Sequence, residues 1–393
     1  MKLCYTNDQI FPNDETDGEQ LIQTVSTMAR NGAELSFLLP RAWRHPGVTL
    51  ETLRKRYHVE LDVALRTLPS LFPSNRLFEK WGHALRAVLS PEAAQAEVLY
   101  TRNIPTLVTA LLLSQHALVY ETYRNWPDQY PGFGWLFRQI GKQPRFLGAV
   151  LHSQFAAQSY RRAGVPDEKL YPRHNGYEPR LLEPVLSKSE AREKLGLAQD
   201  RPVLCYSGHV SVAKGIMLVL ELAEAFPDCT FIIVGSKEHG EVEQRAATLA
   251  NVRVEPWMAY RDTLPFLYAA DVLIIPPTLG PLQKVGNTVL PIKTFLYMAT
   301  GRALFAPDSP DLRELLVHRE NAYLVPPDDV SAAISGLREL LADQALLATI
   351  SERAKTQAAG LTYLQRSRDI LSFIERRLDD RQRATRSRCC TDA

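Results

Sequence analysis

The sequence predicts an α/β protein with two doubly wound domains in tandem, each built on a parallel sheet between helices. Short apolar runs alternate with stretches of helical spacing almost throughout the chain, which is typical of strand–helix–strand units. A polar stretch at 175–197 interrupts this rhythm, which then restarts. The length of 393 residues also suits two ordinary domains. Ligands of such sheets bind at the carboxyl ends of the strands.

The first domain, placed at 1–182, opens on an apolar strand at 2–6. Residues 19–32 have helical spacing and end at Asn31-Gly32, which suits a helix C-cap. Four further apolar runs are expected to be strands: 33–40, 97–101, 116–121 and 148–153.

The second domain, placed at 188–360, repeats this alternation. Strands are expected at 202–208, 229–235, 252–256 and 271–277, and helices at 216–226, 241–250 and 261–270. Residues 361–393 are expected to form a helix that can cross back to the first domain, followed by a basic tail. The tail, 376–393, has few apolar residues and is expected to be disordered.

Composition excludes several classes of protein. The formal net charge of +2 does not indicate a nucleic-acid partner. No apolar run approaches the roughly 20 residues of a membrane span, and the N-terminus is too short and polar for a signal peptide. Three of the five cysteines (Cys4, Cys205 and Cys229) lie in or beside apolar runs and are expected to be buried thiols. These features favour a reducing, cytoplasmic location.

A candidate anion site lies in the sequence YSGHVSVAKG at 206–215. Gly208 allows a tight turn after a strand, and Lys214 stands where the next helix opens. Amide groups at a helix start, together with the ammonium group, suit a diphosphate. The alternative is an ordinary strand-to-helix turn with an exposed lysine.

A second helix start lies within 284–302. Pro291 suits a first helical turn, so the helix is expected to begin there and to end at Gly301. The polar and backbone groups expected to face an anion belong to Asn287, Thr288, Val289 and Leu290. Lys293 opposes the helix dipole, a cost that an anion or an acidic neighbour would offset.

The later residues of this helix are expected to have a structural role. Phe295, Tyr297 and Met298 are expected to form a buried helix face.

Two stretches of the first domain are also candidates for a site. The first stretch is Asp17-Gly18, which follows the first strand. Gly18 would let a ligand approach the backbone closely. The alternative is that Asp17 is only the N-cap of the helix that follows. Glu121, Tyr123 and Arg124 follow the strand at 116–121 and suit the edge of a cleft, or Glu121 and Arg124 form a structural salt bridge.

No metal or dinucleotide motif is visible. The histidines are scattered, and the Asp pairs at 328–329 and 379–380 fall in a loop and in the tail. The segment 230–241 carries no dinucleotide fingerprint.

In order and spacing, these stretches resemble the fourth family of retaining glycosyltransferases, the glycosyl transferases group 1, whose GT-B fold has two Rossmann-like doubly wound domains facing across a cleft. The resemblance covers most of the chain. It is strongest at 206–216, 229–236, 268–277, 290–329 and 341–356, with further matches at 98–103, 119–124 and 152–179.

The resemblance implies that the first domain takes the acceptor and the second a nucleotide-diphosphate sugar. A sugar would pass to a hydroxyl with retention, as in hexosyltransferases, without a metal or other cofactor. His209 and Lys214 would hold the diphosphate, and Gly18 would approach the donor. Acceptors in such proteins include glycans and lipids, as in cell-envelope or glycolipid biosynthesis.

Three residues depart from the family pattern. Thr288 and Leu296 stand where the family often has two glutamates, the second of which grips the ribose hydroxyls. Losing such a charged hydrogen bond costs about 1.5–3 kcal/mol. Tyr123 stands where a histidine is frequent. The alternative to a glycosyltransferase is therefore a non-catalytic relative that binds sugar nucleotides or acts as a scaffold. A hydrolase or epimerase of sugar nucleotides is the third alternative.

The chemistry requires charge stabilisation and removal of one proton. Lys214, Lys293 and helix-start amides would stabilise the leaving diphosphate. The family's usual mechanism gives the acceptor proton to a donor phosphate oxygen; Glu121 is the candidate base among the side chains by type.

The first domain also carries a candidate membrane surface. Residues 41–90 hold nine Lys/Arg against four Asp/Glu, and they combine this charge with the large apolar residues Trp43, Leu71, Phe72, Leu77, Phe78 and Trp81. This combination suits peripheral contact with the inner, anionic face of a membrane. The alternative is that the aromatic residues are core and the basic residues a solvated surface.

Overall fold

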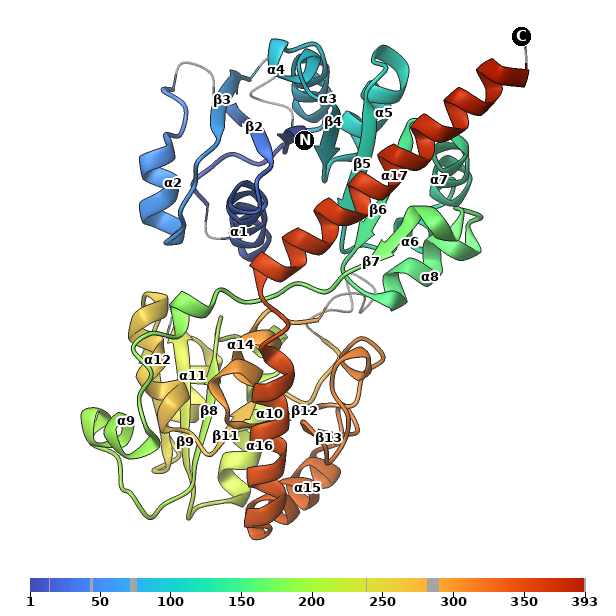
Figure 1. The fold of residues 1–393 in the computed structure, drawn as a ribbon. Coiled ribbons are helices and arrows are strands. Elements are labelled where there is room, and N and C mark those ends of the chain that lie inside the picture. Colours follow the sequence, from blue (N-terminus) through green and yellow to red (C-terminus); the bar gives the residue numbers. More distant parts are fainter. Residues whose placement is uncertain (14, 43–44, 71–75, 238, 281–289, 392–393) are drawn as a thin grey trace. The chain divides into compact units, whose positions relative to one another are not determined.

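The structure, a computed structural model, describes the chain except residues 14, 43–44, 71–75, 238, 281–289 and 392–393, and gives only the backbone at 16 and 385–391. It forms two compact units (Figure 1). The first combines Met1–Asn175 with Tyr363–Ala393, and the second is Gly176–Thr362. That the first unit binds the acceptor and the second binds the donor stays a prediction.

Seven parallel strands form the sheet of the first unit in the described part of the chain, in the order β3-β2-β1-β4-β5-β6-β7. They are β1 (Lys2–Thr6), β2 (Glu34–Arg41), β3 (Ala64–Pro69), β4 (Val98–Thr101), β5 (Ala117–Thr122), β6 (Phe146–Leu151) and β7 (Leu170–Pro172). The order reverses between β1 and β4, where Thr6 and Thr101 are register partners. Doubly wound sheets bind ligands at this position.

The helices of the first unit cover both faces of its sheet. They are α1 (Thr16–Arg30), α2 (Leu50–Tyr57), α3 (Arg76–Val88), α4 (Pro91–Ala94), α5 (Ile104–Leu113), α6 (Trp126–Gln129), α7 (Phe133–Lys142), α8 (Gln154–Arg162), the 3-10 turn η1 (Asp167–Lys169) and α17 (Tyr363–Thr391). Alternate strand side chains point to opposite faces. Leu3 and Tyr5 therefore join the core under α1, α2 and α17, and Cys4 joins the core under α3, α5, α7 and α8.

The second unit repeats this plan with six described strands in the order β10-β9-β8-β11-β12-β13. They are β8 (Val203–Ser207), β9 (Thr230–Ser236), β10 (Val252–Pro256), β11 (Val272–Ile274), β12 (Ala303–Pro307) and β13 (Tyr323–Val325), all parallel. The order reverses between β8 and β11, so the loop after β8 lies at the edge where a ligand is expected.

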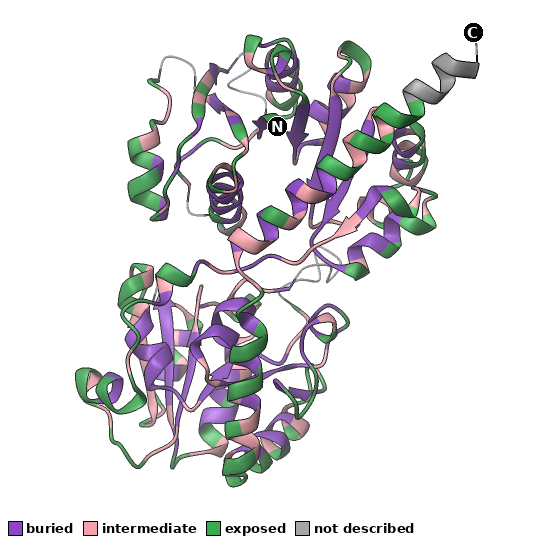
Figure 2. Ribbon diagram, viewed as in Figure 1, coloured by how far each residue is buried: buried purple, intermediate pink, exposed green. Residues whose placement is uncertain are grey.

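Two layers of helices enclose this second sheet. The helices are α9 (Lys188–Leu195), α10 (Ile216–Ala225), α11 (Glu241–Ala246), α12 (Tyr260–Ala269), α14 (Lys293–Thr300), α15 (Val330–Ala342) and α16 (Gln344–Ala358), with 3-10 turns η2 (Pro179–Leu182), η3 (Val212–Lys214) and η4 (Leu312–Glu314). One layer contains α9, α12 and α14, and the other contains α10, α11 and α15. Figure 2 shows the central strands of both sheets buried and the outer faces of the helices exposed. The predicted fold class is confirmed.

Three local predictions are corrected. The N-cap of α1 is Glu15 rather than Asp17, which lies in the first turn. The N-cap of α14 is Ile292, so Pro291 precedes the helix. The tail expected to be disordered continues α17 as far as Thr391. A helix docked through Ile370 and Ile374 extends into the tail because Arg, Gln and Ala are favourable helix formers.

Candidate functional site

The loop after β8 places a glycine and a lysine at the carboxyl edge of the second sheet. Gly208 has φ 139°, and a Cβ there would lie 2.7 Å from Nζ of Lys293, so the position requires glycine. Lys214 ends η3, directly before the left-handed Gly215 that is the N-cap of α10. His209 is exposed, and its backbone carbonyl accepts a hydrogen bond of 2.9 Å from the Tyr206 hydroxyl.

Lys293, the first residue of α14, lies against the same loop. Its ammonium donates to the Ser207 carbonyl oxygen at 2.8 Å and lies 3.8 Å from the centroid of the Tyr206 ring. These contacts offset the helix-dipole cost expected from the sequence. Burial, and then the charge of Lys214, lower the pKa of Lys293 to about 7. Two cations are therefore held close enough to repel, an arrangement that an anion would stabilise.

The rest of α14 belongs to the core. Phe295, Tyr297 and Met298 are fully buried, as predicted. The Tyr297 hydroxyl accepts from the Ser207 amide at 2.7 Å, so α14 also fixes the end of β8. Leu296, at the position of the family's second glutamate, is 8% exposed and belongs to the hydrophobic core.

Of the four donor-site candidates before α14, the structure describes only Leu290. Leu290 is buried in the same core as Leu296. Asn287, Thr288 and Val289 lie outside the described residues.

At the start of α1, Gly18 faces the side chain of Asn13. A Cβ at Gly18 would lie 2.4 Å from the Asn13 side-chain oxygen, so a larger residue there would displace this side chain. Asp17 accepts a hydrogen bond of 2.7 Å from Gln9 Nε2. A role for Gly18 toward a donor stays a prediction.

Glu121 lies inside the first unit rather than at an open edge. It is 1% exposed, and four side chains donate to its carboxylate. Oε1 accepts from Arg366 Nη2 at 2.6 Å and from His152 Nε2 at 2.8 Å, and Oε2 accepts from Tyr100 at 2.9 Å and from Tyr5 at 3.3 Å. The salt bridge that the sequence suggested with Arg124 is therefore formed with Arg366 instead.

These contacts determine the charge of Glu121. Burial by itself raises the pKa of Glu121, but the charges of Arg366 and Arg102 and the hydrogen bond from His152 hold it well below its usual range. Burial lowers the pKa of His152 to about 4. With Asn175 Nδ2 3.2 Å from His152 Nδ1, the network assigns a neutral imidazole that donates from Nε2 to Glu121.

Arg366, on α17, is the charged partner of Glu121, and the sequence did not single it out. It is 2% exposed, and its Nε donates to the His174 carbonyl oxygen at 3.0 Å. Its separation of 245 residues from Glu121 explains why no local pattern reveals the pair. An arginine among the apolar residues of a predicted helix is the only signal that the sequence offers.

Tyr123 and Arg124 continue from β5 at its carboxyl end. The Tyr123 ring lies 6.1 Å from the His152 ring, between centroids. The Arg124 guanidinium lies 5.0 Å from the centroid of the Trp126 ring and 5.8 Å from that of Tyr123. Tyr123 thus lies beside the buried network of Glu121.

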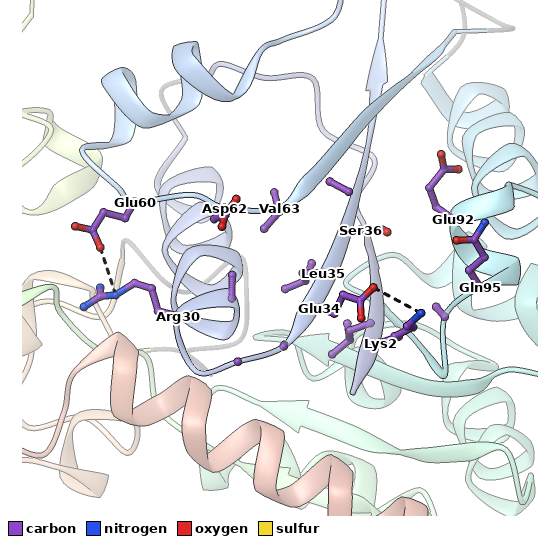
Figure 3. Close-up of a pocket in the computed structure, with 16 residues that line it drawn as sticks. Lys2, Arg30, Glu34, Leu35, Ser36, Glu60, Asp62, Val63, Glu92 and Gln95 are labelled. Carbon is purple, nitrogen blue, oxygen red and sulfur yellow. Dashed lines mark ion pairs between the residues drawn. The ribbon is translucent and has the colours of Figure 1, made fainter.

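A hollow of about 620 Å³ lies at the opposite, amino edge of the first sheet (Figure 3). The beginnings of β1, β2 and β3 line it, and two ion pairs cross its rim, Lys2 with Glu34 at 3.7 Å and Arg30 with Glu60 at 3.9 Å. Asp62 and Glu92 add further negative charge to its lining. This acidic hollow is unsuited to a diphosphate.

Two other features are absent from the residues that the structure describes, a metal site and a membrane span. No group of three His, Cys, Asp or Glu side chains there could hold a metal ion. No helix among these residues is long and apolar enough to cross a membrane.

Solved structures of other proteins share this architecture over nearly the whole chain. A glycosyltransferase from Rickettsia africae superposes with a TM-score of 0.73 at 13% identity, covering 96% of this chain and 98% of that one. Anabaena Alr3699/HepE, solved in complex with UDP-glucose, superposes with a TM-score of 0.67 at 19% identity, covering 95% and 99%. The chain therefore has the GT-B fold, as predicted.

The second unit carries the family signature. Residues 187–357 match the family model described as Glycosyl transferases group 1, so the resemblance to this family lies in that segment. The alpha-D-kanosaminyltransferase of Streptomyces kanamyceticus is 24% identical over 199 residues, 49% of each chain. An uncharacterized glycosyltransferase of Haemophilus influenzae is 26% identical over 173 residues, 42% of this chain and 46% of its own. The match thus spans about half the length of these curated relatives.

Proposed function

We propose that the protein transfers a sugar from a nucleotide-diphosphate sugar to an acceptor hydroxyl, with retention at the anomeric carbon and without a metal or other cofactor. The observation that carries the proposal is the pairing of Lys214 with Lys293 beside Gly208, where α10 and α14 begin. The family match and the UDP-glucose complex of the Anabaena protein support a nucleotide sugar as the donor.

In this reaction the bond between the anomeric carbon and the donor phosphate oxygen breaks. Lys214 and Lys293 stabilise the negative charge that develops on the departing diphosphate. The acceptor oxygen bonds to the same face of the sugar, and its proton passes to a phosphate oxygen of the leaving group. Glu121 does not take the acceptor proton in this proposal, because both of its oxygens already accept hydrogen bonds inside the unit.

Binding of sugar nucleotides without turnover is the alternative function. It is favoured by Leu296, which belongs to the core and offers the ribose no hydrogen-bond acceptor. In that case the second unit would hold a donor, and the protein would act as a scaffold.

Labelled UDP-, GDP- and ADP-glucose, each incubated with the whole chain, distinguish the two functions. We expect slow release of nucleoside diphosphate with water as the acceptor, unchanged by EDTA. Binding of the same compounds without any release would support the scaffold, and loss of release in EDTA would contradict metal independence.

We also propose that the protein works in the cytoplasm, as a peripheral protein on an anionic membrane. Four large apolar residues of α3 support this, because they are exposed: Leu77, Phe78, Trp81 and Leu85 are between 42% and 65% exposed. Trp43, Leu71 and Phe72 lie outside the described residues. Arg76 and Lys80 are exposed on the same helix. Each basic residue near an anionic surface contributes about 1 kcal/mol.

Sedimentation with vesicles tests this second proposal. We expect binding to phosphatidylserine-containing vesicles but not to neutral ones, lost in high salt and in Arg76→Glu/Lys80→Glu. Trp81→Ser should weaken the binding, whereas Trp135→Ser, at an exposed position on α7, serves as the matched control. Equal sedimentation with and without vesicles would contradict membrane contact.

A further inference from the structure

The hollow at the amino edge of the first sheet lies opposite the edge where ligands of such sheets bind, and it has a chemistry of its own (Figure 3). Its floor is apolar, because Leu3, Leu35 and Val63 are buried. Its lining carries four carboxylates against two basic side chains: Glu34, Glu60, Asp62 and Glu92 against Lys2 and Arg30. Such a hollow can enclose the apolar stem of a basic side chain and pair with its charged end.

Most carboxylates of the hollow are only weakly paired. The two ion pairs across its rim are long, at 3.7 and 3.9 Å, and exposed pairs of this kind contribute about 0–1 kcal/mol. Glu92 is paired more closely, with Arg66 at 2.7 Å. Asp62 is exposed. An incoming cation would therefore compete with weak contacts at Glu34, Glu60 and Asp62.

Three exposed leucines continue this edge beyond the hollow. Leu89 directly follows α3 and stands three residues before Glu92, and Leu112 and Leu113 lie at the end of α5, ahead of β5. These leucines are 64%, 77% and 53% exposed. Helices α3 and α5 pack on the same face of the sheet. Because β1, β4 and β5 are successive strands, the leucines and the hollow are separated by about two strand spacings, or 9–10 Å.

The two ends of α3 differ in charge and therefore suit different partners. Arg76 and Lys80 lie in its first half, where we propose contact with an anionic membrane. Glu92 and the other carboxylates of the hollow lie beyond its end, where an anionic headgroup would be repelled. Exposed leucines beside an acidic hollow instead fit a partner that offers both apolar and basic side chains.

We propose that the amino edge of the first unit is a docking surface for a basic amphipathic helix of a partner protein. A basic side chain of this helix enters the hollow, and its apolar face covers Leu89, Leu112 and Leu113. A helix of 18 residues is about 27 Å long, which is enough to span the hollow and the leucines. The surface lies apart from the donor site, so the inference does not depend on the proposed function.

Fluorescence anisotropy with two labelled helical peptides tests the docking surface. Both have 18 residues and the same leucine positions, and the other positions are Lys in one and Glu in the other. We expect the whole chain to bind the Leu/Lys peptide at least about tenfold more tightly, or 1.4 kcal/mol. Glu34→Gln/Asp62→Asn and Leu112→Ser/Leu113→Ser should each weaken that binding about fivefold. Glu51→Gln, on α2, and Val185→Ser, in the second unit, are matched controls at exposed positions and should not change it.

Four results would overturn the proposal. Equal binding of the two peptides would show that the carboxylates play no part. Binding of the Leu/Lys peptide that neither double variant weakens would place the peptide elsewhere. Spermidine bound as tightly as the Leu/Lys peptide would identify a small organic cation as the ligand. If Leu112→Ser/Leu113→Ser loses binding to phosphatidylserine-containing vesicles and keeps binding to the peptide, these leucines belong to the membrane surface.

Discussion

Replacing Arg366 by alanine should destabilise the first unit far more than an ordinary surface substitution. Arg366 and Glu121 are 2% and 1% exposed, and Arg366 also donates to the His174 carbonyl oxygen. Removing one partner of a buried ion pair leaves an uncompensated charge and costs about 3–5 kcal/mol. The three remaining donors to Glu121 place the expected loss at the lower end of this range, about 3 kcal/mol.

The stability lost in Arg366→Ala should also depend on pH, because Glu121 titrates. The folded-state pKa of Glu121 is lowered, so its ion pair contributes stability above the unfolded pKa of about 4.3 and loses it as pH falls through the folded value. Without Arg366, the pKa of Glu121 rises toward that of a buried carboxyl group. The difference in stability between parent and variant should therefore be largest near neutral pH and should shrink in acid.

Hydrogen-exchange mass spectrometry in urea suits this test, because peptides of β5 and α17 report on the first unit separately from the second. Arg161→Ala is the control, since its pair with Asp167 is 45% and 67% exposed and should contribute at most about 1 kcal/mol. Glu121→Gln/Arg366→Met should recover part of the loss. A change below 1 kcal/mol for Arg366→Ala would refute the buried-pair reasoning.

Three further predictions concern the second unit. Lys214→Ala should raise the donor KM or lower kcat at least tenfold, about 1.4 kcal/mol; full activity in a folded variant would contradict the diphosphate site. Lys293, whose pKa is lowered to about 7, should take up a proton when UDP binds at pH 8, because the diphosphate favours the charged ammonium; equal calorimetric enthalpies in buffers of different ionisation enthalpy would contradict this. Leu296→Glu should lower stability and should not tighten UDP binding, because the carboxylate would enter an apolar core; tighter binding would show that the family's usual ribose contact can be restored.

Local pattern was sufficient for most of the secondary structure. The apolar run at 2–6 became β1, and the helical spacing from 19 onward lies in α1, which ends at Arg30 with Asn31 as its C-cap. Helix starts were less predictable: Asp17 and Pro291 both suit a first turn, and backbone hydrogen bonds decide which residue is the cap. The prediction of a disordered tail, which was made from composition, was wrong. Low apolar content does not stop a helix that begins on a packed segment.

The sequence by itself therefore determined the alternation of strands and helices, the two sheets it implies, and Gly208 and Lys214 at a helix start. These follow from spacings of a few residues, which are local. Only the tertiary structure decided that Lys293 lies against Ser207 and Tyr206, that Leu296 packs into the core, and that Glu121 pairs with Arg366. Such pairings depend on which distant segments the packed sheets bring together, and a carboxylate at a strand end looks the same in sequence whether it faces a ligand or a buried arginine.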